Sequence, residues 1–407
     1  MHIVMVAAGA HGHVNPNLPV ITELVARGHR VQYAVPEPFV EAAASTGATP
    51  LVTTSVLPGT RGGPERWPVD PIEGMAFFLD EAMHVTPQLV AALDDDRPDL
   101  FLADIGGYPA RVLALRWSVP LVQLSPAMVA WEGYEADNPE VVAMLHDDPR
   151  GVAYLRRFAD WLAAQGVDLD PETFTGRPPR SVVLIPRALQ PHAARVDPDV
   201  YTFVGPCLDA RPHQAGWPEP DRPLVLVSMG SAYTADPGFY RACAEAFGDG
   251  TRRVVIALGG HFDPADLGEL PDGVEAHPWV PQLAVLRRAS LFVTHAGMGS
   301  CSEGLANGVP MIAIPRAVDQ FSNAALLAAA GLGVVVDSDD VTIDALRRAA
   351  AALDDDEVRR RCAVAAEELR AAGGAAHAAD VIEEVASPGQ QRSAERSARR
   401  NGHRGPL

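Results

Sequence analysis

The sequence predicts an α/β protein made of two Rossmann-like, doubly wound domains. Short β-branched runs alternate with longer helical patterns, which is typical of parallel strands joined by right-handed crossovers. The alternation occurs twice, on either side of a proline-rich stretch. The 407 residues are enough for two domains of about 100–200 residues each.

The first half contains six short apolar runs that we expect to form one parallel sheet. They span residues 3–8, 30–35, 49–52, 100–103, 121–124 and 181–185. A helix is expected between the first two runs, with Asn15 as its N-cap and Pro16 at its first position. Gly28 marks the end of this helix.

A stretch without periodicity, residues 205–223, contains five prolines and is expected to link the domains. We therefore expect an N-terminal domain over 1–204 and a C-terminal domain over 224–386. The strands expected in the second domain are 224–228, 253–258, 291–294, 311–314 and 333–336. The helices expected there are 237–247, 281–289, 299–307, 321–330, 342–353 and 355–372.

The end of the chain divides into two parts. The last helix before residue 386 is expected to pack back on the N-terminal domain. Residues 387–407 contain five arginines, one glutamate and almost no apolar side chain, so we expect a disordered tail. A solvated end is favoured over a contact between this tail and an acidic surface.

The composition of the chain argues against several classes of protein. The net charge of −19 argues against nucleic acid as a partner, because phosphates would be repelled over most of the surface. The four cysteines are scattered without metal-ligand spacing, which argues against a disulfide framework or a zinc site. No run approaches the roughly 18 apolar residues of a membrane span, and nothing resembles a signal peptide. We therefore expect a cytoplasmic protein.

Two residues at one edge of the first sheet could form a catalytic pair. Ligands of open α/β sheets bind beyond the carboxyl ends of the strands. His13 follows the first expected strand, in a loop near a helix N-terminus that would keep its imidazole neutral. Asp104 directly follows the fourth strand and could hold and orient the imidazole. On the sequence alone, a helix-capping role for Asp104 and a loop hydrogen bond for His13 are equally favoured.

The second half contains a glycine-rich turn at the end of a strand, in the stretch VTHAGMGSCSEGLANGVP, residues 293–310. Its glycines bring the backbone close to a ligand, and a helix that starts near Ser300 offers free amides to a phosphate. The turn lacks a Walker lysine and the G-x-G-x-x-G spacing. The acidic runs 94–96 and 354–356 flank expected helices, so caps are favoured over magnesium ligands.

The sequence around this turn carries a specific family resemblance. Residues 277–324, HPWVPQLAVLRRASLFVTHAGMGSCSEGLANGVPMIAIPRAVDQFSNA, resemble the nucleotide-sugar motif of UDP-dependent glycosyltransferases. The stretches AAGAHGHVNPNLPVITELVARGHRVQYAVP, DIGGYPARVLALRWSVP, LSPAMVAWEGY and YTFVG resemble the macrolide glycosyltransferases of actinomycetes. The resemblance covers everything except the arginine-rich tail. It implies the GT-B fold, in which two Rossmann-like domains face each other across a cleft.

The resemblance also implies residue roles in donor binding. Trp279 would stack on the uracil. The backbone of Val280 and the side chain of Gln282 would contact the uridine, and Glu303 would bind the ribose hydroxyls. The remaining donor residues would hold the diphosphate, namely Ser231, His295, Gly297, Gly299 and Ser300. Asp319 and Gln320 would bind the hydroxyls of the sugar.

The reaction implied by the resemblance is an inverting, metal-independent hexosyl transfer. His13, backed by Asp104, would take the proton from an acceptor hydroxyl as that oxygen attacks the anomeric carbon of UDP-glucose. The family implies no metal and no other cofactor, since the UDP-sugar is a co-substrate. The sequence leaves open whether the chain forms a homodimer.

The expected acceptor is a hydrophobic, cationic small molecule. The segments 54–84 and 126–150 carry aromatic and methionine side chains beside carboxylates, which suits a large amphiphilic ligand. The residues expected to bind it are Trp67, Phe77, Phe78, Met83 and Trp131, although an ordinary core role is equally favoured. The resemblance points to the amino-sugar hydroxyl of a macrolide antibiotic, which glucosylation would inactivate.

Three rival functions remain open. A biosynthetic transferase could use a dTDP-deoxysugar, although Asp319 and Gln320 favour a fully hydroxylated hexose. A sugar-nucleotide epimerase of the same fold would need carboxylates around the inverted carbon. A non-catalytic partner of another glycosyltransferase would be expected to have lost either His13 or the phosphate site.

Overall fold

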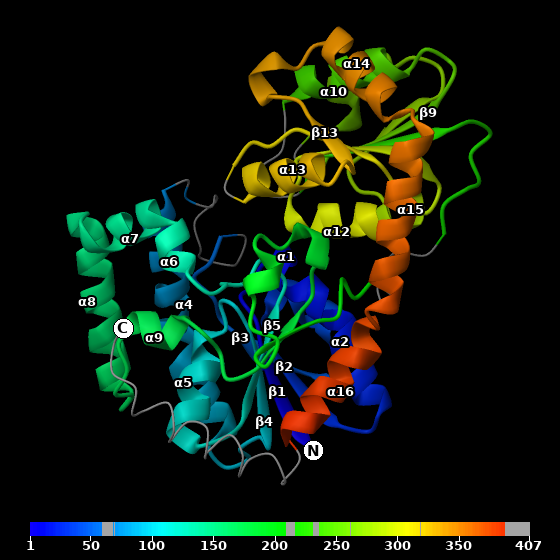
Figure 1. The fold of residues 1–407 in the computed structure, drawn as a ribbon. Helices are drawn as coiled ribbons and strands as arrows, with labels where there is room; N and C mark the ends of the chain where they lie inside the picture. Colours follow the sequence, from blue (N-terminus) through cyan, green and yellow to red (C-terminus); the bar gives the residue numbers. More distant parts are fainter. Residues whose placement is uncertain are drawn as a thin grey trace. The chain divides into compact units, whose positions relative to one another are not determined.

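The computed structural model describes residues 1–58, 68, 70–208, 216–230, 236–260, 262–317 and 319–386. The chain divides into two compact units (Figure 1). One unit comprises Met1–Leu184, Ala194–Ala210 and the chain from Gly373, and the other comprises Ile185–Ala193 and Arg211–Ala372. Residues 209–215 of the expected linker and the arginine-rich tail lie outside the described residues.

The first unit is built on a seven-stranded parallel sheet in the order β3-β2-β1-β4-β5-β6-β7. All six predicted strands are present: β1 His2–Val6, β2 Arg30–Pro36, β3 Thr49–Thr53, β4 Leu100–Asp104, β5 Leu121–Ser125 and β6 Ser181–Val183. A seventh strand, β7 Tyr201–Phe203, was not predicted. Three residues at the edge of a sheet are too few to show a period in the sequence.

Strand β1 is buried on both faces and shows where the core lies. Ile3 and Met5 belong to a core cluster with the side chains of α2 (Leu18–Ala26) and α16 (Gly374–Ala386). Val4 and Val6 point to the opposite face and belong to a cluster with α4 (Pro71–Leu93), α5 (Tyr108–Trp117) and α8 (Pro149–Ala164). Because a parallel sheet is covered on both sides, its strands are apolar throughout.

The final helix, α16, packs against α2 within this unit (Figure 1). Ala378 and Ile382 are completely buried in the shared core cluster. At the surface, Arg27 forms ion pairs with Asp380 at 2.7 Å and with Glu383 at 2.8 Å. The other helices of the unit are α1 His11–Val14, α3 Val40–Ser45, α6 Tyr134–Asp137, α7 Pro139–His146 and α9 Pro171–Thr175.

The first helix begins earlier than predicted. Asn15 does not act as an N-cap: helix α1 already begins at His11, after an Ala10 that has no side-chain cap, and Asn15–Asn17 form a 3₁₀ turn between α1 and α2. Asn15 itself has helical backbone angles, with φ −58°. The side chain of Asn17 bonds back to the carbonyl of His13 at 2.6 Å, which stabilises this continuous helical path. His13 therefore lies in a helix and not in a loop. Gly28, with φ +87°, ends α2 as predicted.

The segment 54–84, which carries several of the expected acceptor residues, includes the start of a long helix. Helix α4 begins at Pro71, and the carboxylate of Asp70 accepts hydrogen bonds from the amides of Ile72 and Glu73 at 3.0 Å. This is an N-cap followed by proline at the first helical position. Phe77, Phe78 and Met83 therefore lie on helix α4.

The second unit contains a six-stranded parallel sheet in the order β10-β9-β8-β11-β12-β13. The strands are β8 Leu224–Ser228, β9 Arg253–Ala257, β10 Val274–His277, β11 Ala289–Thr294, β12 Met311–Ala313 and β13 Gly333–Val335. The helices are α10 Pro237–Phe247, α11 Gln282–Leu286, α12 Met298–Ala306, α13 Gln320–Ala329, α14 Ile343–Leu353 and α15 Asp356–Ala371. Edge strand β10 was not predicted, because its half-buried sequence VEAH has no apolar run. The two sheets confirm the predicted pair of Rossmann-like domains.

The cysteines lie inside the fold, and the two acidic runs lie at helix ends, with Asp94 after α4 and Asp355 before α15. All four cysteines are free and buried. Asp355 caps α15 through the amides of Glu357 and Val358. None of the described helices is long and apolar enough to cross a membrane.

Candidate active site

His13 and Asp104 are brought together by the pairing of two central strands. Strands β1 and β4 are parallel neighbours in which Val6 pairs with Ala103, so the segments that follow them leave the sheet at the same edge. Asp104 is the last residue of β4, and His13 lies in the short helix after β1. The imidazole Nδ1 of His13 is hydrogen-bonded to Oδ2 of Asp104.

The carboxylate of Asp104 is held by the backbone as well. Its side chain is completely buried, and its Oδ1 accepts hydrogen bonds from the amides of Ala8 at 3.3 Å and Gly106 at 3.0 Å. Gly107 is required next to it, because a Cβ at that position would lie 2.7 Å from the carbonyl oxygen of Val6. Asp104 therefore has one fixed orientation, in which its second oxygen faces His13.

The pKa of His13 is raised, contrary to the expectation that a helix N-terminus would keep the imidazole neutral. Burial of the imidazole lowers its pKa, but the charge of Asp104 and the hydrogen bond to it outweigh burial, and the net shift is upward from 6.5. A full carboxylate in direct contact acts more strongly than the partial charge of a helix end. With Nδ1 directed at Asp104, Nε2 is the nitrogen that can take a proton from a ligand.

Two further residues fix the position of His13. Asn17 is completely buried and donates its side-chain amide to the His13 carbonyl. The ring of Phe78, from α4, lies beside the imidazole with the ring centroids 5.6 Å apart. The His13 side chain remains 19% exposed, so the base is restrained and still accessible.

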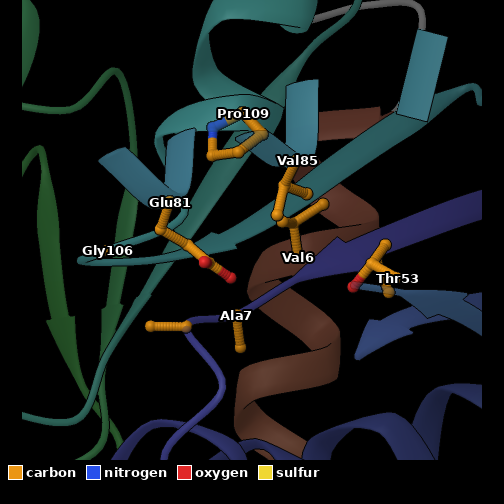
Figure 2. A pocket seen from close by; sticks show the side chains of 9 residues that line it. Val6, Ala7, Thr53, Glu81, Val85, Gly106 and Pro109 are labelled. Carbon is orange, nitrogen blue, oxygen red and sulfur yellow. The ribbon is translucent and has the colours of Figure 1, made fainter. Parts of the chain in front are cut away.

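The first unit contains a small cavity among strands β1, β2 and β3 and the helices α4 and α5. It is lined by Val6, Ala7, Ala8, Ala34, Thr53, Glu81, Val85, Gly106 and Pro109, and it measures about 10 Å³. Figure 2 shows the Glu81 carboxyl pointing into it. Burial raises the pKa of Glu81, whose Oε2 accepts the Val56 amide at 2.9 Å. A space of this volume is the size of one water molecule, so it is not the acceptor site.

The residues expected to bind the acceptor have different environments. Phe78 is in ring contact with His13. Phe77 is half-buried on α4, and Met83 packs against the core cluster beneath that helix. Trp131, after β5, donates its indole N–H to Asp137 at 2.6 Å. Trp67 lies outside the described residues.

In the second unit, Trp279 presents an uncovered aromatic surface. Its side chain is 62% exposed, which is unusual for tryptophan. Gly260, with φ +77°, packs against the indole so closely that a Cβ there would lie 2.9 Å from its Nε1. The neighbouring Val280 is half-buried. The indole is therefore supported by backbone and remains open to a stacking partner.

Gln282 and Glu303 form a hydrogen-bonded pair. Gln282 begins α11, and its Nε2 donates to Oε2 of Glu303 in α12 at 2.7 Å. Glu303 is only 6% exposed. The amide thus orients a buried carboxylate, which can accept hydrogen bonds from hydroxyl groups of a ligand.

The turn after β11 places His295 at the start of α12. The imidazole lies between two glycines: a Cβ on Gly230 would be 2.7 Å from the ring, and one on Gly297 would be 2.4 Å from it. Burial lowers the pKa of His295 to about 4, so the ring is neutral at physiological pH. Gly297 is the N-cap of α12 and has no side chain to cap the helix amides. This leaves a helix N-terminus that suits a phosphate.

Two further phosphate candidates, Gly299 and Ser300, lie on the first turn of α12. Gly299 is exposed, and a Cβ there would meet nothing within 4 Å. Ser300 is half-buried. Ser231 lies outside the described residues.

Gln320 uses its side-chain oxygen within the protein. Its Oε1 accepts the amides of Arg316 at 2.8 Å and Ala317 at 3.1 Å, and the side chain is 3% exposed. The side-chain oxygen of Gln320 therefore stabilises the turn before α13. The side-chain amide nitrogen is the group that can still bind a sugar hydroxyl. The adjacent Asp319 is more exposed, although burial raises the pKa of its carboxyl.

Two asparagines at these sites were missed by the sequence analysis. Asn17 contacts the backbone of His13, and Asn323 donates to Asp319 at 2.8 Å. Each lies four residues after its partner, a spacing that brings groups together on a helix. This spacing was the only available signal for both.

Comparison with known proteins assigns the chain to a family. A family model described as "UDP-glucoronosyl and UDP-glucosyl transferase" matches residues 211–368. An oleandomycin glycosyltransferase of Streptomyces antibioticus is 52% identical over 353 residues, covering 85% of this chain and 81% of the relative. A demethyllactenocin mycarosyltransferase of Streptomyces fradiae is 33% identical over 358 residues, covering 85% of this chain and 77% of the relative.

Solved structures show the same architecture. The kitacinnamycin glycotransferase structure has a TM-score of 0.86 and 46% identity, covering 94% of this chain and 98% of that chain. A calicheamicin glycosyltransferase has a TM-score of 0.82 and 33% identity, with the same coverage of both chains. The chain thus belongs to the UDP-glucoronosyl and UDP-glucosyl transferase family and is a glycosyltransferase of the GT-B type.

Proposed function

We propose that this protein transfers glucose from UDP-glucose to a hydroxyl of a macrolide antibiotic, with inversion at the anomeric carbon. The observation that carries the proposal is the hydrogen bond from His13 to the buried Asp104. An imidazole oriented in this way can serve as a general base.

The base is needed because an alcohol is a weak nucleophile at neutral pH. In the proposed step, Nε2 of His13 takes the hydroxyl proton while the acceptor oxygen bonds to the anomeric carbon and the bond from that carbon to the UDP oxygen breaks. Asp104 stabilises the resulting imidazolium. Attack opposite to the leaving UDP in a single displacement inverts the configuration.

The donor would be bound by the residues of the second unit. Trp279 stacks on the uracil next to Val280, while Glu303, oriented by Gln282, binds the ribose hydroxyls. His295 and the start of α12, including Gly297, Gly299 and Ser300, stabilise the charge that develops on the departing diphosphate. Ser231 assists them. We propose that this stabilisation requires no metal ion.

The sugar would be held mainly by Asp319, with the amide nitrogen of Gln320 as a second group. These polar groups suit a hexose with a complete set of hydroxyls, because a deoxysugar would leave one of them unpaired. This favours glucose as the transferred sugar.

The acceptor class is supported by the relatives. One relative is named for oleandomycin and another for demethyllactenocin. The ring of Phe78 beside His13 offers an apolar contact close to the base, and Phe77, Met83, Trp131 and Trp67 remain further candidates. The proposed outcome is inactivation of the macrolide in the cytoplasm.

The test is an incubation of the purified protein with a panel of macrolides and either UDP-glucose or a dTDP-linked deoxysugar as donor, followed by mass spectrometry. A gain of one hexose from UDP-glucose on a macrolide with an amino sugar supports the proposal. Transfer only from dTDP-linked deoxysugars would instead indicate a biosynthetic enzyme. If the protein binds UDP but transfers sugar from neither donor, the proposal of a macrolide acceptor would be contradicted.

A further inference from the structure

We infer that Asn323 is a positioning residue that locks the sugar-binding carboxylate of Asp319 to the turn at the start of α12. This inference rests on the proposed role of Asp319 in donor binding. It goes beyond that role because it assigns the geometry of the carboxylate to a second side chain.

The amide nitrogen of Asn323 bonds to both parts of the donor site at once. It donates one hydrogen to Oδ2 of Asp319 at 2.8 Å and the other to the carbonyl oxygen of Ala296 at 3.0 Å. Both partners are acceptors, which identifies the contacting atom as the nitrogen of the amide. Asn323 is completely buried, so water does not compete for either bond.

The carbonyl that Asn323 holds belongs to a strained residue. Ala296 has φ +61°, a left-handed conformation that is unfavourable for a residue with a side chain. It lies between His295 and Gly297, and its amide also bonds to the hydroxyl of Thr294 at 3.2 Å. Strained backbone at functional sites persists where surrounding contacts hold it. Asn323 and Thr294 supply such contacts from two sides.

The carboxylate of Asp319 uses its Oδ2 in the bond to Asn323. The other lone pairs of the carboxylate can accept hydrogen bonds from sugar hydroxyls. The sugar-binding group and the phosphate-binding turn are therefore held at a fixed spacing, although 27 residues separate Ala296 from Asn323 in the sequence.

This arrangement predicts a specific effect on catalysis. Without Asn323, Asp319 loses its orientation, and stabilisation of the hexose in the transition state weakens. UDP has no hexose, so its affinity does not depend on Asp319. In the phosphate-binding turn, the bond from the Ala296 amide to Thr294 remains when Asn323 is replaced, so we expect the turn to keep its affinity for the diphosphate. The loss should therefore appear in transfer and not in nucleotide binding.

The experiment is a double-mutant cycle on the full-length chain. Asn323→Ala, Asp319→Ala and the double variant are compared for kcat/KM of UDP-glucose at saturating acceptor and for the Kd of UDP by calorimetry. We expect Asn323→Ala to lower kcat/KM about 10- to 100-fold and to change the Kd of UDP by less than about threefold. The double variant should lose no more than Asp319→Ala alone, because Asn323 acts through that carboxylate.

Two further variants keep the result interpretable. Asn307→Ala is the matched control: it removes an asparagine bond of the same length, 2.8 Å, to the carbonyl of Glu303 without contact to Asp319 or Ala296, and kcat/KM should stay within about threefold. If Asn323→Ala does not fold, Asn323→Ser replaces it. The serine hydroxyl can bond to the helix carbonyl four residues back but is too short to hold both partners of the amide.

Three outcomes would overturn the inference. In the first, the losses in kcat/KM of the two single variants add up in the double variant. In the second, the Kd of UDP for Asn323→Ala rises by the same factor by which kcat/KM falls. In the third, Asn323→Ala has the same kcat/KM as Asn307→Ala. Failure of the proposed donor can be distinguished from failure of this inference. If the wild-type protein uses a dTDP-sugar, the same double-mutant cycle is measured with that donor and with dTDP, and it tests the role of Asn323 in the same way. A wild-type protein that transfers no sugar would contradict both proposals.

Discussion

Nδ1 of His13 is hydrogen-bonded to a carboxylate oxygen of Asp104, 91 residues away in the sequence. The pairing of β1 with β4 explains this contact, because it brings the carboxyl ends of both strands to one edge of the sheet. The consequence is chemical: the raised pKa of His13 makes the imidazole a stronger base than a free histidine. The predictions below follow from this pair and from the donor residues.

The rate should rise with pH. His13 must be deprotonated to accept a proton, and its folded-state pKa is raised from 6.5 by Asp104. We predict that kcat/KM increases through an apparent pKa above 6.5 and then levels off. In Asp104→Asn the carboxylate charge is gone and burial dominates, so the midpoint should move to lower pH. A pH profile of both proteins is the measurement, and an unchanged midpoint in Asp104→Asn would contradict the assignment.

The contribution of the His13–Asp104 pair to folding stability should fall as pH rises, whereas the rate should increase. A group whose pKa is raised on folding stabilises the folded state fully below its unfolded pKa, near 6.5, and the contribution disappears as pH rises through the folded pKa. The stability difference between wild type and Asp104→Asn in urea should therefore be larger at pH 6 than at pH 9. A difference that grows toward high pH would show that another group dominates.

Trp279→Ala should weaken UDP binding. The indole is 62% exposed, so its removal leaves no cavity, and folding stability should change little. Loss of base stacking costs about 1–3 kcal/mol, which corresponds to about a 5- to 150-fold higher Kd by calorimetry. Val364→Ala, at another exposed apolar position in the second unit, is the control and should bind UDP normally. Equal affinity of both variants for UDP would exclude stacking on Trp279.

Gly297→Ala should disable the phosphate turn. A Cβ at this position would lie 2.4 Å from Nε2 of His295, so the imidazole must move away. We expect at least a tenfold loss in UDP affinity, since about 1.4 kcal/mol of lost contacts is sufficient. Gly74→Ala, in α4 where a Cβ meets nothing within 4 Å, should retain normal binding and stability. If Gly297→Ala bound UDP as the wild type does, His295 would not contact the diphosphate.

Chelation should leave the rate almost unchanged. A helix N-terminus and a neutral imidazole stabilise the leaving diphosphate in the proposed mechanism, so no divalent cation is required. Initial rates with and without EDTA should agree within about twofold. A rate that disappears with EDTA and returns with Mg²⁺ or Mn²⁺ would contradict this description of the donor site.

The sequence predicted the strands well and the details of the site less well. Central strands such as residues 224–228 are continuous apolar runs because helices cover both faces of the sheet. Strands β7 and β10 were missed because edge position and short length remove that pattern. The segment Asn15-Pro16 has the composition of a helix start, but the bond from Asn17 to His13 extends the helical path back to His11.

Interactions between distant segments were the least predictable. The sequence placed His13 and Asp104 at one edge, but the direction of the pKa shift depends on a direct contact that only the folded backbone around Asp104 produces. The role of Asn323 depends on the left-handed conformation of Ala296. This conformation could not be predicted from the sequence, because glycine is the residue that usually adopts it. Sugar binding by Gln320 stays a prediction, but the sequence did not indicate that its side-chain oxygen holds the turn before α13.

The most direct test of the mechanism is the kcat of His13→Ala, measured with UDP-glucose and a macrolide acceptor alongside the Kd of UDP. A positioned base contributes about 10²–10⁴-fold to the rate, and His13 lies in the first unit whereas Trp279 and His295 lie in the second. We therefore predict that kcat falls by at least about 100-fold while UDP binds as in the wild type. A His13→Ala protein that folds, binds UDP and retains more than about a tenth of the wild-type kcat would contradict the assignment of His13 as the general base.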